Sequence, residues 1–89
     1  MYYFYVLRFK KSGKLYKGYT SDLKRRIKEH LCGNSVFTSQ NGNFDLIFYE
    51  AFINKKDAQE AEKYFKSGHG REVLKDKLKN YLEEKGGFA

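Results

Sequence analysis

The fold of this chain is decided by residues 2–31, which read YYFYVLRFKKSGKLYKGYTSDLKRRIKEHL. The stretch Tyr2–Phe9 is a run of aromatic and branched residues without a breaker, which predicts a strand buried on both faces. Residues 10–14 contain a glycine and predict a turn. Residues 15–20 then return as a second strand, so the chain opens with a β-hairpin.

A helix, a third strand and two further helices are predicted after the hairpin. In chain order they are a helix from Asp22 to about Cys32 capped by Thr20 or Ser21, a loop over 33–43, a strand over 44–52, a helix over 55–67 capped by Asn54, the break Gly68-His69-Gly70, and a helix over 71–84. This order, ββαβαα, predicts an α+β fold with a small three-stranded, mainly antiparallel sheet flanked by helices. With 89 residues the chain has room for one core. We therefore expect a single domain over residues 1–84 and a frayed tail over 85–89.

The positive charge of the chain is concentrated in its first third. The chain carries 18 Lys and Arg against 11 Asp and Glu, a net charge of +7. Residues 1–28 hold nine basic residues and one acidic residue, so they carry +8 and the remainder carries −1. A one-sided positive field of this kind favours a polyanion such as nucleic acid as partner. A basic protein without an anionic partner is the alternative.

Composition excludes several classes of protein. The single Cys32 excludes an internal disulfide framework and a cysteine-cluster zinc site. No apolar stretch approaches the roughly 18 residues of a membrane span, and the first residues lack the basic segment of a signal peptide. We therefore expect a cytoplasmic protein without a membrane partner.

Two predicted helices place titratable side chains on their apolar faces. In the first, Arg26 and His30 lie three and seven residues after Leu23, on or beside the inward face. In the second, Glu62 falls inside the apolar stripe, where a carboxylate is costly unless a cation meets it. Arg26 and a divalent metal ion are both candidates for that cation. A purely architectural Glu62–Arg26 ion pair is the alternative.

Two tyrosines and a glycine of the predicted hairpin join this group. Tyr5 and Tyr16 lie on faces that a hairpin can bring together, so we expect both phenols near Glu62, Arg26 and His30. The alternative is that each tyrosine packs half-buried with its hydroxyl in water. Gly18 removes a side chain in mid-strand, which predicts either a bulge or the close approach of another group, such as a phosphate, to the backbone.

Taken together, these residues resemble the GIY-YIG nuclease superfamily, in particular small stand-alone domains similar to the nuclease domain of the bacterial excision-repair endonuclease. The first signature looks like Phe4-Tyr5-Val6 and the second like Tyr16-Lys17-Gly18. Arg26 follows the second tyrosine by ten residues and His30 comes four later, which are spacings that this family uses. Glu62 looks like the metal-binding glutamate of the family. The resemblance covers residues 2–82.

The sequence also departs from the family pattern. Phe4 stands where the first motif has glycine, and Lys17 replaces an apolar residue of the second. The family's active-site asparagine follows the glutamate by about a dozen residues, but positions 74–77 contain none and Asn80 is further along.

The resemblance implies a metal-dependent endonuclease that hydrolyses DNA phosphodiester bonds, in DNA repair or processing, with a single Mg²⁺ or Mn²⁺ held by Glu62. Tyr5 or Tyr16 is implied as general base or water-orienting group, and Arg26 with His30 as neutralisers of the phosphate charge. The implied catalytic residues are Tyr5, Tyr16, Arg26, His30 and Glu62. The residues expected to contact nucleic acid are Lys17, Gly18, Tyr19, Lys24, Arg25, Lys28, Lys66 and Arg71.

Two other classes of function are open at this point. One is a non-catalytic nucleic-acid-binding module that keeps the fold, and the other is a structural or protein-binding domain. RNA as the nucleic acid is open as well. So is the oligomeric state, with a homodimer or a specificity-supplying protein partner as candidates.

Overall fold

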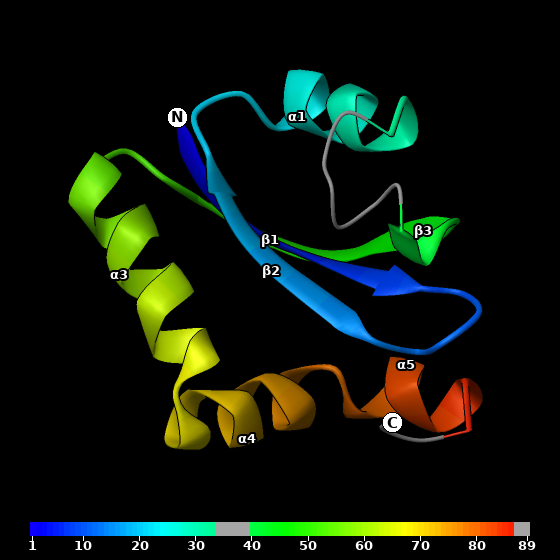
Figure 1. The fold of residues 1–89 in the computed structure, drawn as a ribbon. Coiled ribbons are helices and arrows are strands. Elements are labelled where there is room, and N and C mark those ends of the chain that lie inside the picture. The colour runs from blue at the N-terminus through cyan, green and yellow to red at the C-terminus, as the bar shows by residue number, and fades with distance from the viewer. Residues whose placement is uncertain (34–39, 87–89) are drawn as a thin grey trace.

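The computed structural model describes residues 1–33 and 40–86, and it confirms the α+β architecture (Figure 1). Residues 34–39 of the predicted loop and 87–89 of the predicted tail lie outside the described residues. The elements are β1 (Tyr2–Phe9), β2 (Leu15–Thr20), α1 (Leu23–Leu31), β3 (Phe44–Phe52), α3 (Lys55–Lys66), α4 (Gly68–Lys77) and α5 (Lys79–Glu84). In the described ranges, no helix has the length and hydropathy needed to cross a bilayer.

The sheet has the order β2-β1-β3, and both strand pairs are antiparallel. Figure 1 shows α1 on one face of the sheet and α4 and α5 on the other. The central strand β1 is buried on both faces, as its apolar run predicts. On the α4 side, Phe4 and Val6 enter the core, and the ring of Phe4 stacks on that of Phe65 from α3 at 4.9 Å. The core residues are Phe4, Val6, Phe65, Leu74, Leu78 and Leu82.

The first helix starts at a different cap from the one predicted. Asp22 is the N-cap of α1, and its carboxylate accepts a hydrogen bond from the backbone amide of Arg25 at 3.1 Å. The Thr20 hydroxyl instead accepts from the amide of Asp22 at 3.1 Å, which fixes the turn before the helix. The predicted cap of α3 is correct, since the Asn54 side chain accepts from an amide two residues on.

The C-terminal region contains two helices, and the prediction of one helix over residues 71–84 after a glycine break is wrong. Gly68 and Gly70 do not break the helix but form the first turn of α4. The hydroxyl of Ser67 caps this turn by accepting a hydrogen bond from the amide of Gly70 at 3.2 Å. A Cβ on Gly70 would overlap the carbonyl of Tyr64, so glycine here allows α4 to pack on the end of α3. Leu78 then separates α4 from α5 and is itself buried in the core.

Candidate active site

Four predicted catalytic residues gather on the face of the sheet that α1 covers. The Tyr5 hydroxyl lies 2.9 Å from Nε2 of His30. The ring centre of Tyr16 lies 6.2 Å from that of Tyr5 and 5.2 Å from that of His30. Arg26, one turn before His30 on α1, interacts electrostatically with both phenols. We call Tyr5, Tyr16, Arg26 and His30 the polar cluster.

Gly18 creates the space in which Tyr5 reaches this cluster. The sheet register places Gly18 directly opposite Tyr5. A Cβ on Gly18 would lie 2.5 Å from both Cζ and the hydroxyl oxygen of Tyr5, so any larger residue would displace the ring. The close approach predicted at Gly18 is therefore made by the ring of Tyr5. Gly18 is buried beneath that ring, which gives it a packing role, and the predicted phosphate contact stays a prediction.

Burial keeps the Tyr5 phenol protonated. The side chain is 1% exposed, and burial is the main reason that its pKa rises to about 12, with a smaller contribution from the Tyr16 phenol. Arg26 acts in the opposite direction without cancelling this shift. A general base needs a lowered pKa and access to water. Tyr5 has neither, so the structure fits a positioning role for Tyr5 and leaves Tyr16, which is half-buried, as the accessible phenol.

His30 is a neutral imidazole in this environment. It is 2% exposed, and burial together with the positive charge of Arg26 lowers its pKa from the ordinary value of 6.5. Both effects disfavour the protonated imidazole in the free protein, and the predicted role of His30 in neutralising phosphate charge stays a prediction. Its hydrogen bond with Tyr5 is its visible role, and among the described residues its Nδ1 has no hydrogen-bond partner.

Arg26 is the cation of the cluster. Burial by itself lowers the pKa of the guanidinium, but its interactions with Tyr5 and Glu29 outweigh burial and raise the pKa, so it stays charged. An Nη atom of Arg26 lies 3.2 Å from a carboxylate oxygen of Glu29. Glu29 was not among the predicted site residues, although its i, i+3 spacing from Arg26 was a usable signal. The side chain of Arg26 remains 31% exposed, so a ligand can reach it.

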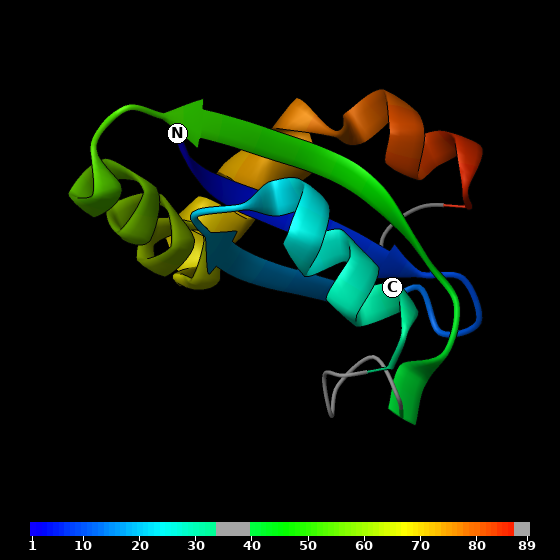
Figure 2. The same cartoon turned by 90° about the horizontal axis from the view of Figure 1, so that it is seen from above.

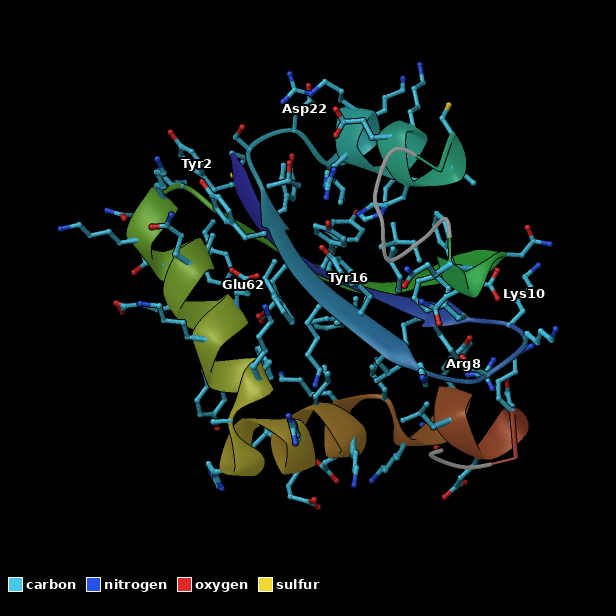
Figure 3. All side chains as sticks on the ribbon, in the orientation of Figure 1. Tyr2, Arg8, Lys10, Tyr16, Asp22 and Glu62 are labelled. Carbon is cyan, nitrogen blue, oxygen red and sulfur yellow. The ribbon has the colours of Figure 1, made fainter. Side chains whose placement is uncertain are left out.

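Glu62 belongs to α3, whereas the polar cluster comes from β1, β2 and α1. It is on α3, where the Nζ of Lys66 lies 3.0 Å from its carboxylate, and Figure 3 shows it extending from the middle of α3 toward β2. The side chain is 27% exposed, as its place in the apolar stripe predicts. The architectural Glu62–Arg26 ion pair is wrong, because these residues pair with Lys66 and Glu29 instead.

The donor set around Glu62 fits one kind of metal ion. Within residues 1–33 and 40–86, no three His, Cys, Asp or Glu side chains are grouped to hold an ion. A single accessible carboxylate suits a hard cation such as Mg²⁺ or Mn²⁺, whose other ligands are water and phosphate oxygens. It does not suit structural zinc, which requires four protein ligands. Glu62 is therefore compatible with the predicted single divalent ion.

Basic side chains occupy two surfaces. On α1, Lys24, Arg25 and Lys28 are exposed. On the opposite face of the sheet, Lys17 lies close to three further cations on α3 and α4; burial first, and these cations second, lower its pKa. We call this group, Lys17, Lys66, Arg71 and Lys75, the lower basic cluster. The sequence analysis had singled out all but Lys75. Tyr19 is half-buried and lies two residues after Lys17 in β2, so both side chains are on the same face of the sheet. Tyr16, Gly18 and Thr20 are on the other face.

Comparison with known proteins decides the family. The family profile described as the GIY-YIG catalytic domain matches residues 1–80. This chain belongs to the GIY-YIG family. The resemblance drawn from the motifs is thereby confirmed, together with a nuclease-type fold, and domains of this family act on nucleic acids.

UPF0213 proteins that match over most of their own length are similar to this chain. The UPF0213 protein YazA of Bacillus subtilis is 38% identical over 85 residues, which cover 94% of this chain and 80% of the relative. A UPF0213 protein of Lacticaseibacillus paracasei is 40% identical over 76 residues, covering 82% of this chain and 84% of the relative. The solution NMR structure of the UPF0213 protein BH0048 from Bacillus halodurans is 37% identical, with a TM-score of 0.55 and coverage of 97% and 94%.

The two GIY-YIG motifs lie side by side, and their departures from the family pattern face away from the polar cluster. Tyr5 of the first motif pairs with Gly18 of the second, so the two motifs form one packing unit. Phe4 points into the opposite core, and Lys17 lies on that same side. Asn80, which follows Glu62 at a longer spacing than the family's active-site asparagine, is exposed in α5. The substitutions at Phe4 and Lys17 therefore leave the polar cluster intact.

Proposed function

We propose that this chain is a metal-dependent endonuclease that hydrolyses DNA phosphodiester bonds. The observation that carries the proposal is the convergence of Tyr5, Tyr16, Arg26 and His30 on one face of the sheet. Buried polar groups and a charged guanidinium are costly unless they are satisfied, and apolar residues would fill the same space at lower cost. Membership of a family that acts on nucleic acids supports the same conclusion.

The residues of the polar cluster divide the chemistry between them. In hydrolysis, a water oxygen bonds to phosphorus, the P–O ester bond breaks, and the leaving oxygen takes a proton from solvent. Arg26 stabilises the negative charge that develops on the phosphate oxygens. Tyr16, the accessible phenol, orients the attacking water, and the proton that this water loses passes to solvent. Tyr5 and His30 hold this arrangement through their buried hydrogen bond.

Glu62 is the residue that would hold the divalent ion. When bound, such an ion supplies a second positive charge beside the scissile phosphate. In the free protein the carboxylate of Glu62 pairs with Lys66. If Glu62 held the ion instead, the ammonium of Lys66 would be available to a backbone phosphate. One Mg²⁺ or Mn²⁺ suffices for this arrangement.

The two basic surfaces supply non-specific affinity for the DNA backbone. Exposed cations on α1 and the lower basic cluster lie on opposite faces of the sheet, and β2 forms the edge between them. Such contacts position a nucleic acid without reading its sequence, and they weaken steeply as salt is raised.

Nicking of a supercoiled plasmid in Mg²⁺ or Mn²⁺ tests the proposal. We expect the wild type to nick the plasmid and Glu62→Ala to be slower by at least about 100-fold, since it removes the ion's carboxylate. Glu60→Ala is the matched control, because Glu60 is an exposed glutamate on the same helix. Equal rates for Glu62→Ala and the wild type, from identical preparations, would refute the assignment of Glu62.

A non-catalytic nucleic-acid-binding module is the second candidate function. It is favoured by the Glu62–Lys66 ion pair, which leaves the carboxylate neutralised without metal. Salt-sensitive DNA binding by a wild type that nicks nothing at any metal concentration would select this candidate.

A further inference from the structure

A groove of about 780 Å³ lies between α1 and β3, with Tyr3 of β1 among its lining residues. Its walls are α1 and β3, and Figure 2 shows β3 running uncovered alongside the helix. Leu23 and Ile27 line it from α1, and Leu46 and Tyr49 line it from β3. None of the roles proposed above uses these residues.

The floor of the groove is aromatic and accessible. The rings of Tyr3 and Tyr49 meet edge to face, with centres 6.2 Å apart. Tyr49 is 54% exposed and Leu46 is 39% exposed, although both belong to the sheet. Flat, exposed aromatic surface of this kind is what stacks on nucleobases in proteins that bind single strands.

The rim of the groove is basic. Lys24 and Lys28 lie one turn apart on α1, are exposed, and line the groove. The acidic residue among the lining side chains, Asp22, is engaged in capping α1 through the amide of Arg25. With a net charge of +7, two copies of this chain repel each other at this rim, whereas a polyanion is attracted to it.

We propose that this groove binds an unpaired nucleobase of a single-stranded nucleic acid, with Tyr49 as the stacking platform and Lys24 and Lys28 on the flanking phosphates. The inference rests on the proposed function, whose substrate class it narrows. Tyr3 and Tyr5 are two residues apart in β1 and therefore lie on the same face of the sheet, about 7 Å apart. Tyr3 belongs to the groove floor and Tyr5 to the polar cluster, so the two sites are neighbours. A base in the groove and a phosphate at the cluster therefore belong to one strand.

Binding of a fluorescein-labelled 15-nucleotide dT strand, followed by anisotropy in EDTA, tests the groove without any cleavage. We expect Tyr49→Ala to bind about tenfold more weakly than the wild type. Tyr64→Ala is the matched control, because Tyr64 is 41% exposed on α3 and lies outside the groove. A strand of 15 abasic sites should bind the wild type and Tyr49→Ala equally, since it has phosphates but no bases. Circular dichroism should give both variants the wild-type melting temperature.

Several results would overturn the inference. The first is equal affinity of the wild type and Tyr49→Ala for dT. The second is a loss of affinity in Tyr49→Ala that is as large for the abasic strand as for dT. The third is no binding of dT by the wild type at low salt. A wild-type dimer that Tyr49→Ala dissociates, seen by sedimentation, would assign the groove to a second copy. Because the assay contains no metal, a Tyr49-dependent preference for bases without nuclease activity would retain the groove and reject the proposed endonuclease. Cleavage without that preference would do the reverse.

Discussion

Replacing Tyr5 with phenylalanine removes one oxygen atom from the buried end of the polar cluster. The lost hydrogen bond spans 2.9 Å to His30, and both residues are at most 2% exposed. Nδ1 of His30 already has no hydrogen-bond partner among the described residues, and the variant also removes the hydrogen bond between Nε2 and Tyr5. Leaving a buried polar group unsatisfied costs about 1–3 kcal/mol. We therefore expect the free energy of unfolding to fall by about 2 kcal/mol and the Tm by about 10 °C.

Urea and thermal unfolding followed by circular dichroism measure this loss. Tyr49→Phe is the matched control, because it removes the hydroxyl of an exposed tyrosine, and we expect a change within about 0.5 kcal/mol. In the double variant Tyr5→Phe/His30→Leu, part of the loss should be recovered, since neither polar partner is left alone in the core. If Tyr5→Phe is as stable as the wild type, the reasoning about this buried pair is refuted.

Three further predictions concern pH, packing and charge. The pKa of His30 in the folded chain lies below 6.5, so the unfolded chain binds more protons at acidic pH. The free energy of unfolding should therefore fall as the pH drops below about 6.5, by at most about 1.4 kcal/mol per pH unit. Urea unfolding between pH 5 and 7 should show this slope in the wild type and in His69→Gln, and the slope should be lost in His30→Leu. Gly70→Ala should destabilise the chain by about 1–3 kcal/mol or more, since the added Cβ meets the backbone of α3. Gly68→Ala is the control and should be tolerated, because there is open space around Gly68. Thermal melts compare the two variants, and equal Tm values would contradict the proposed contact between α3 and α4. Lys17→Met should raise the free energy of unfolding by no more than about 1 kcal/mol, because it relieves repulsion from three neighbouring cations, and the accompanying rise in Tm should be larger at low salt than at high salt. The same variant should weaken DNA binding in an anisotropy titration, and an unchanged DNA affinity would remove Lys17 from the binding surface.

Most of the fold follows from local patterns in the sequence. The three strands and the start of α3 are marked by apolar runs and a capping residue, and the structure has them where those signals lie. The cap of α1 is Asp22, one or two residues after the predicted cap. The region after Ser67 is the exception, because a glycine is ambiguous when read alone. At Gly70 the missing side chain permits two helices to touch, and only the tertiary packing of α4 on α3 reveals this. The break at Leu78 similarly depends on how its side chain enters the core.

Four of the five predicted catalytic residues come together in the structure, but the ion-pair partners of Arg26 and Glu62 were not predictable. Spacing on one helix and alternation on two strands were enough to bring Tyr5, Tyr16, Arg26 and His30 together. The partner of Arg26 could not be chosen in the same way, because Glu29 and Glu62 both offer a carboxylate, and the distance between helices decides between them. Protonation states were also out of reach, since they depend on burial that spacing does not measure.

Cleavage by Arg26→Ala tests most directly the claim that the polar cluster is the active site. The measurement is the nicking rate of a supercoiled plasmid in Mg²⁺, with DNA affinity measured in parallel in EDTA, and the control is Arg25→Ala, the exposed neighbour on α1. We predict that Arg26→Ala nicks at least about 100-fold more slowly while retaining DNA binding and fold, and that Arg25→Ala loses only a few-fold. Wild-type nicking by Arg26→Ala would contradict the account.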